Sequence, residues 1–122
     1  MAKILIIEDD RQFRAMLRQM LERADHEVIE AGTGDEGLEC FRQEAPDLLI
    51  LDMMTPGRDG LEVLEEIRQE SPTLKVIAIS GGLKGDTSWL EPLAHRLGVR
   101  SFMHKPFNKD ELLETVMAAM EE

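Results

Sequence analysis

The stretch that decides the fold is Asp47-Leu-Leu-Ile-Leu-Asp-Met-Met-Thr-Pro-Gly-Arg-Asp-Gly60. Leu48–Leu51 is a short, wholly apolar run, and such a run between polar residues is typical of a strand buried on both faces of a parallel sheet. The run ends on the carboxylate of Asp52, and turn-forming residues follow it. Ligands of open α/β sheets bind beyond the carboxyl ends of the strands. Asp52 is therefore expected where such a sheet carries its functional groups, although an Asp that simply opens a loop has the same local pattern.

Four more strands are predicted, and helical patterns separate them. The strands are expected at 4–7, 26–30, 74–79 and 100–104. Between and after them, apolar residues recur at the three- and four-residue spacing of one helix face. The residues of these predicted faces are Phe13, Met16, Leu17, Met20 and Leu21; Leu38, Phe41 and Ala45; Leu61, Leu64 and Ile67; Leu90, Leu93, Ala94 and Leu97; and Leu112, Leu113, Val116, Met117 and Met120. Five strands alternating with five helices predict right-handed crossovers and a parallel sheet covered on both faces.

Capping and helix-breaking residues indicate where the helices begin and end. A polar side chain before a helix accepts an N–H from the first turn, and proline cannot continue a helix that precedes it. The second helix is predicted to have a cap at Thr33 or Asp35 and to end at Pro46, and the third is predicted to end at Ser71-Pro72. The fourth is expected from Ser88 to Leu97, with Pro92 in its first turn. The last is expected to have a cap at Asn108 or Asp110.

Composition argues against several classes of function. With 25 acidic and 14 basic residues, the chain has a formal net charge of -11, which repels phosphate backbones and anionic membrane surfaces. Direct binding to nucleic acid or to a membrane is therefore not expected. The lone Cys40 forms no internal disulfide, and no apolar run approaches the roughly 18 residues of a membrane span. The expectation is one cytoplasmic domain.

Four of the five predicted strands carry a chemical group at their carboxyl ends. These groups are Glu8 and Asp9, Asp52, Ser80 and Lys105. In a parallel sheet the carboxyl ends of the strands share one edge, so these groups are expected to converge. Crowded carboxylates require a cation, and a site of oxygen ligands suits Mg²⁺. Because a lysine and a serine hydroxyl are good partners for phosphoryl oxygens, the edge is expected to receive a phosphoryl group.

Taken singly, each group has a commoner structural role. Lys105 has the pattern of a surface lysine and Ser80 that of a turn residue. Phe102, inside the last predicted strand, has the pattern of an aromatic side chain in the core. The joint occurrence of the groups at successive strand ends favours the functional interpretation.

These strand-end groups, with Pro106 directly after Lys105, resemble the receiver domain of two-component response regulators. The resemblance extends over the whole chain. The resemblance implies a single receiver domain at 1–122, with the flavodoxin-like strand order 2-1-3-4-5. It implies that Asp52 is the phosphoacceptor, attacking a phosphohistidine to give an acyl phosphate. By the same resemblance, Asp9, Asp52 and the backbone carbonyl of Met54 hold Mg²⁺, and Glu8 contributes directly or through water. Asp10 matches the position that caps the first helix.

The resemblance also implies a switch. Lys105 pairs with Asp52 and then with the phosphoryl group, and Ser80 moves to donate its hydroxyl to that group. The added charge, about -1.5 to -2 at neutral pH, draws Ser80 inward and leaves space for the ring of Phe102. The surface of the fourth helix, fifth strand and fifth helix then changes. Pro106 matches a position where the family has a cis Lys-Pro bond.

The resemblance implies a sensor histidine kinase or histidine phosphotransfer protein as donor, an unspecified downstream effector, and a monomer or a phosphorylation-dependent homodimer. No catalytic turnover is expected beyond self-phosphorylation and self-dephosphorylation at Asp52. Two alternatives remain: an interaction module that works without phosphorylation, and a Mg²⁺-dependent phosphohydrolase. The second is disfavoured because such hydrolases place an acid two positions after the nucleophile, where this chain has Met54.

Two stretches depart from the family pattern. Thr55 stands where many relatives have Met or Leu before the proline. The segment from Ser80 to Lys105 is longer than usual, and the added residues are expected within 81–88, a loop with three glycines. We expect this loop to respond to phosphorylation in an atypical way.

Overall fold

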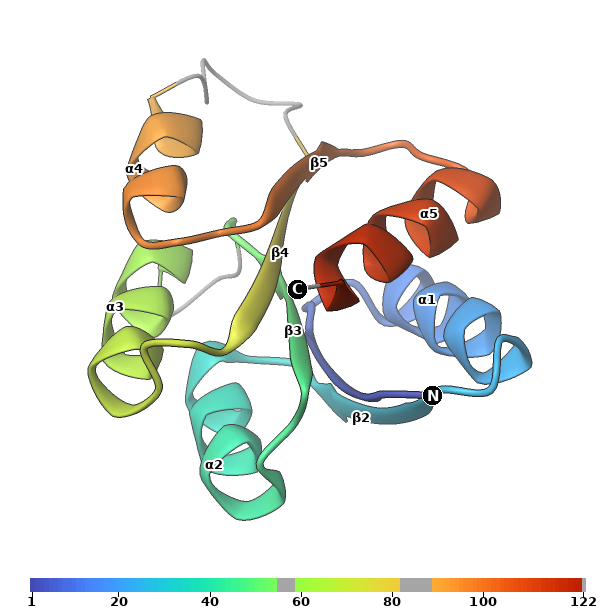
Figure 1. Ribbon diagram of the computed structural model, residues 1–122, viewed down its shortest axis with the longest axis horizontal. Coiled ribbons are helices and arrows are strands. Elements are labelled where there is room, and N and C mark those ends of the chain that lie inside the picture. The colour runs from blue at the N-terminus through green and yellow to red at the C-terminus, as the bar shows by residue number, and fades with distance from the viewer. Residues whose placement is uncertain (55–58, 82–88, 122) are drawn as a thin grey trace.

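The computed structural model describes residues 1–54, 59–81 and 89–121. Within those ranges five strands alternate with five helices, as predicted (Figure 1). The elements are β1 (Lys3–Ile7), α1 (Arg11–Arg23), β2 (Glu27–Ala31), α2 (Gly34–Glu44), β3 (Leu48–Asp52), α3 (Gly60–Glu70), β4 (Lys75–Ser80), α4 (Leu90–Arg96), β5 (Ser101–His104) and α5 (Lys109–Met120). The predicted strand boundaries are within one residue of the observed ones.

The strands form one parallel sheet in the order β2-β1-β3-β4-β5, which confirms the order implied by the family resemblance. β3 is central and every residue in it is buried. It pairs with β1 and β4, so that Leu51 lies opposite Ile7 on one side and Ala78 on the other. The strand that carries Asp52 is therefore held between the two strands whose ends carry Glu8 and Ser80.

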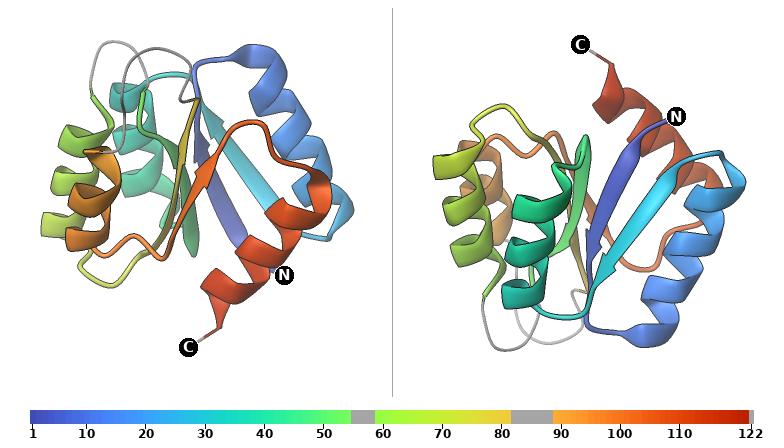
Figure 2. Two further views of the ribbon diagram at one scale, coloured as in Figure 1. Left: turned by 90° about the horizontal axis from the view of Figure 1, so that it is seen from above. Right: turned by 90° about the horizontal axis from the view of Figure 1, so that it is seen from below.

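Helices cover both faces of the sheet, and the side chains of β3 alternate between two cores. Leu49 and Leu51 pack into the core covered by α2, α3 and α4, whereas Leu48 and Ile50 pack into the core covered by α1 and α5. Figure 2 shows α1 and α5 on one side of the sheet and the other three helices on the opposite side. This is the doubly wound α/β architecture that the alternation predicts.

Side-chain caps fix the start of four helices. Asp10 accepts N–H groups of Gln12 and Phe13 in α1, and Thr33, Asp59 and Asn108 cap α2, α3 and α5 in the same manner. The predicted roles of Asp10, Thr33 and Asn108 are thus confirmed. Pro92 is the third residue of α4, inside its first turn as expected.

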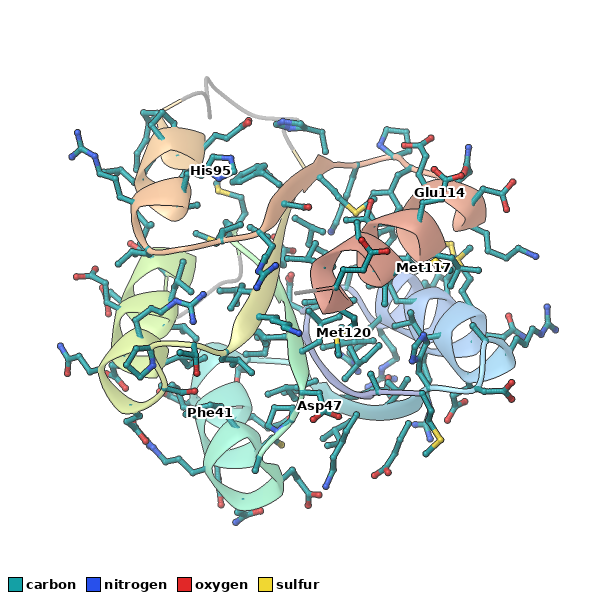
Figure 3. The ribbon with its side chains drawn as sticks, in the orientation of Figure 1. Phe41, Asp47, His95, Glu114, Met117 and Met120 are labelled. Carbon is teal, nitrogen blue, oxygen red and sulfur yellow. The ribbon has the colours of Figure 1, made fainter. Side chains whose placement is uncertain are left out.

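Two predicted core residues are exposed. Ala45 is the cap after α2 and has a left-handed conformation with φ of 46°, so it leaves the helix before it reaches the core. Met117 of α5, which is labelled in Figure 3, is 67% exposed by its surface area, while Leu112, Val116 and Ala119 provide the buried face of that helix. Those two assignments were wrong. Thr55 and the loop segment at 82–88, with Ser88 at the predicted start of the fourth helix, lie outside the described residues.

None of the described helices combines the length and the apolar composition that crossing a bilayer requires.

Gly60 begins α3 directly against the backbone of Met53. A Cβ at position 60 lies 2.5 Å from the Met53 Cα atom and 2.8 Å from its carbonyl oxygen, too close for either backbone to accept. We expect Gly60→Ala to lower the free energy of unfolding by about 2 kcal/mol or more, as overpacking does elsewhere. Gly81→Ala is the matched control, because a Cβ there meets nothing within 4 Å. Urea unfolding of both variants checks this, and equal midpoints would contradict the close packing at Gly60.

Candidate functional site

The sheet brings the predicted strand-end groups to one edge. Glu8 follows β1, Asp52 ends β3, Ser80 ends β4, and Lys105 follows β5. Because these four strands are adjacent and parallel, their carboxyl ends lie side by side. The Lys105 N–H donates to the Ser80 carbonyl oxygen at 2.9 Å, and the Met53 N–H donates to that of Ile79 at the same distance. Pairing thus continues to the rim of the site.

Three carboxylates gather at this edge in different degrees of burial. Glu8 and Asp52 are buried, with exposures of 0% and 3%, whereas Asp9 is exposed. One oxygen from each of the three lies within 4.8 Å of the others. Hard oxygen ligands in such a group, two of them buried and one open to solvent, fit a Mg²⁺ ion that keeps several waters.

Lys105 supplies positive charge to the same group. Its Nζ atom lies 2.6 Å from Glu8 Oε1 and 3.4 Å from Asp52 Oδ2. Its side chain is 20% exposed, so the ammonium is largely withdrawn from water. The Lys105-Pro106 peptide bond is cis, as the family resemblance implied.

The environment shifts two pKa values in this cluster. Burial raises the pKa of Glu8 to about 7, and the nearby Asp52 charge adds to that rise, while hydrogen bonds from Lys105 and the Asp10 N–H oppose it. For Lys105, burial lowers the pKa, but the hydrogen bond to Glu8 and the charges of Asp52 and Glu8 outweigh it, so the pKa is raised. The ammonium is therefore charged at neutral pH, and Glu8 binds a proton readily when no metal is present.

Backbone amides orient the two buried carboxylates. The Met54 N–H donates to Asp52 Oδ1 at 2.9 Å, leaving Oδ2 on the side of Lys105. The Asp10 N–H donates to Glu8 Oε2 at 3.0 Å, and Lys105 takes Oε1. Met54 thus lies beside Asp52 with its side chain half exposed at 49%. The metal role of its carbonyl remains a prediction.

Ser80 carries a buried hydroxyl at the end of β4. The side chain is fully buried, and its Oγ atom has no hydrogen-bond partner among the described residues. Buried hydroxyls are almost always hydrogen-bonded, so such an atom at the rim of a site calls for a partner that enters from outside. The Ser80 hydroxyl is suited to donate to an oxygen of a bound group.

Phe102 lies on β5, and its ring packs toward α4. Its ring is half-buried and packs against the core that contains Leu90 and Ala94 of α4. The ring of His104 lies 5.2 Å from it, centroid to centroid, and His104 Nε2 lies 3.3 Å from Glu91 Oε1 of α4. Phe102 is therefore placed between β5 and α4, and its switch role remains a prediction.

One contact of the site was not predicted from sequence. The Lys105 Nζ atom lies 4.3 Å from the centroid of the Phe13 ring, and the Phe13 and Phe107 rings form a T-shaped pair. Phe13 was predicted only as part of the buried face of α1. The spacing of apolar residues indicates which face of a helix is buried, but gives no signal for the cation beneath it.

The raised pKa of Glu8 predicts that the free energy of unfolding depends on pH. Its pKa is raised on folding from 4.5 to about 7, so its stabilising contribution is complete below the unfolded value and is lost as pH rises through about 7. The comparison is made in the presence of a metal chelator. Between about pH 5 and pH 8, the free energy of unfolding is expected to fall in the wild type. This fall is expected to exceed that of Glu8→Gln by on the order of 2 kcal/mol. Urea titrations at several pH values measure this. Parallel profiles for the two proteins would contradict the raised pKa.

Comparison with known proteins identifies the family of the chain. A family model described as the response regulator receiver domain matches residues 4–117. The chain is 33% identical over 118 residues to the alkaline phosphatase synthesis transcriptional regulatory protein PhoP of Bacillus subtilis, covering 97% of this chain and 48% of PhoP. It is 30% identical over 123 residues to Protein PilH of Pseudomonas aeruginosa, covering 98% of each. The chain therefore spans about half of PhoP and nearly all of PilH.

A solved structure has the same fold. It is a response regulator receiver domain protein, described as CheY-like, from Methanospirillum hungatei. The two structures superpose with a TM-score of 0.90 at 29% sequence identity, and the match covers 97% of this chain and 92% of the other.

Proposed function

Because the chain belongs to the response regulator receiver domain family, we propose that Asp52 accepts a phosphoryl group in a two-component signalling system. The observation that carries the proposal is the pairing of a buried Asp52 with Lys105, near the end of β4, where the buried hydroxyl of Ser80 has no hydrogen-bond partner among the described residues. A carboxylate nucleophile, a cation and a spare donor are the groups that transfer to an aspartate requires. The receiver domain is proposed to occupy residues 1–122.

The transfer begins with the unphosphorylated carboxylate of Asp52. In the proposed step, a carboxylate oxygen of Asp52 forms a bond to phosphorus while the P–N bond of a donor phosphohistidine breaks. The electron pair of that bond returns to the imidazole, which takes up a proton as it leaves. The product is an acyl phosphate on Asp52. The donor is proposed to be a sensor histidine kinase or a histidine phosphotransfer protein.

Mg²⁺ fits the acidic cluster. Asp9 and Asp52, with the carbonyl of Met54, are proposed to hold it, and Glu8 contributes directly or through a water. When bound, this ion supplies positive charge that neutralises the transferring phosphoryl oxygens. Lys105 and the backbone N–H of Met54 hold the Asp52 carboxylate in one orientation, which limits the reorganisation needed for attack.

Two residues are proposed to respond to the new charge. The acyl phosphate adds about -1.5 to -2 charge at neutral pH and several strong acceptor oxygens. Lys105 contacts one such oxygen, and the hydroxyl of Ser80 donates to another, which satisfies the buried donor. Movement of Ser80 gives the ring of Phe102 space to rotate inward, and the α4, β5 and α5 surface changes for a downstream effector or a second copy of the chain.

Phosphorylation by a small donor tests the proposal. The protein is incubated with Mg²⁺ and acetyl phosphate and its intact mass is measured, with a chelator in a parallel sample. We expect one phosphoryl group per chain with Mg²⁺ and none with the chelator. No uptake under either condition would favour an interaction module that works without phosphorylation. Continuous turnover of a phosphoester would instead favour the hydrolase.

A further inference from the structure

Phe13 places an aromatic ring over the cation of the site. It is the third residue of α1, and the Asp10 side chain that caps this helix accepts the Phe13 N–H at 3.1 Å. The ring centroid lies 4.3 Å from Lys105 Nζ, well within the range of a cation–π contact. The ammonium is thus bounded by the oxygens of Glu8 and Asp52 and by the Phe13 ring.

The ring of Phe13 is itself held in place. Phe107, two residues after Lys105, meets it edge to face, with centroids 5.5 Å apart and an interplanar angle of 78°. Both rings pack against the core covered by α1 and α5. T-shaped pairs of this kind are favourable beyond the area they bury. Phe13 of α1 therefore has two contacts with the segment between β5 and α5, one with Lys105 and one with Phe107.

We propose that Phe13 is a positioning residue that keeps the Lys105 ammonium directed at Asp52. The inference rests on the proposed phosphoacceptor function. It gives the Phe13 ring the role of covering the side of the Lys105 ammonium that does not face the carboxylates. Lysine has a flexible four-carbon stem and a strongly hydrated ammonium, so an open side would let it turn toward water. The Phe13 ring replaces that water with a weaker, fixed partner, which leaves Lys105 ready to meet an incoming phosphoryl oxygen.

Phe13→Leu and Phe13→Tyr separate this role from ordinary packing. Leucine keeps an apolar side chain in the core but has no π face, whereas tyrosine keeps the ring. We expect phosphorylation by acetyl phosphate to slow about 3- to 10-fold in Phe13→Leu, as loss of a cation–π contact predicts. Phe13→Tyr is expected to stay within about twofold of the wild type.

A double-variant comparison isolates the connection through Lys105. In a Lys105→Met background the cation is gone, so adding Phe13→Leu is expected to change the phosphorylation rate by less than about twofold. A packing role for Phe13 predicts the same loss in both backgrounds. A further threefold or larger loss in the Lys105→Met background would therefore overturn the proposal.

A spectroscopic measurement adds a test that needs no phosphorylation. In NMR spectra, the Lys105 methylene protons next to Nζ are expected to be shifted upfield by the ring current in the wild type and in Phe13→Tyr, but not in Phe13→Leu. Unshifted Lys105 signals in the wild type overturn the inference even if Phe13→Leu does not fold. If the wild type takes up no phosphoryl group, the proposed function fails and this role with it. If it does and Phe13→Leu matches its rate, only the role of Phe13 is refuted.

Discussion

Asp52→Asn is expected to abolish uptake of a phosphoryl group from acetyl phosphate, lowering the rate by at least about 10³-fold. The amide is a poor nucleophile and forms no stable acyl phosphate, yet it has nearly the same shape as the carboxylate. Its oxygen can still accept the Met54 N–H, which in the wild type lies 2.9 Å from Asp52 Oδ1. The fold and the neighbouring side chains are therefore expected to stay in place.

Asp59→Asn is the matched control for that variant. Asp59 caps α3 through hydrogen bonds from Leu61 and Glu62, and asparagine caps helices as well as aspartate does. We expect this control to be phosphorylated within about twofold of the wild-type rate. Intact mass and a phosphopeptide map measure both proteins. A phosphoryl group that still attaches to Asp52→Asn, at Ser80 or elsewhere, would show that Asp52 is not the acceptor.

The site could be predicted from sequence because its residues are fixed by strand ends. Wholly apolar runs identify strands buried on both faces, and a parallel arrangement brings their carboxyl ends together. Glu8, Asp52 and Lys105 therefore meet in the structure, although 97 positions separate Glu8 from Lys105. Neither their hydrogen bonds nor the raised pKa of Glu8 could be derived in the same way, because both depend on side-chain direction and burial.

The burial of two helix residues was predicted wrongly because the spacing of apolar residues does not by itself determine which of them reach the core. Ala45 continues the apolar spacing of α2, but a left-handed residue ends the helix at that point, and periodicity does not detect such a change. Met117 fits the apolar stripe of α5 equally well, yet the core accepts only one side of that stripe. The contact of Phe13 with Lys105 joins an apolar helix position to a charged strand end, a pairing that neither pattern indicates alone.

Lys105→Met is expected to slow phosphorylation without weakening Mg²⁺ binding. The change removes the positive charge but keeps a long apolar side chain beneath Phe13. Without the ammonium, the phosphoryl oxygens lose a fixed charged partner, and we expect the rate with acetyl phosphate to fall about 10²-fold. Mg²⁺ affinity is expected to stay equal or to increase, because Lys105 competes with the metal for the oxygens of Glu8 and Asp52.

The same variant is expected to be less stable in a metal chelator. Glu8 loses a partner at 2.6 Å while remaining fully buried, and a buried group deprived of its partner costs about 1 to 3 kcal/mol. Lys109→Met, at the exposed start of α5, removes an equal charge elsewhere and serves as control. Calorimetric Mg²⁺ titration, urea unfolding and phosphorylation rates together measure the outcome. If Mg²⁺ affinity fell in parallel with the rate, Lys105 would be supporting the metal site and not the phosphoryl group, and its proposed contact with that group would be refuted.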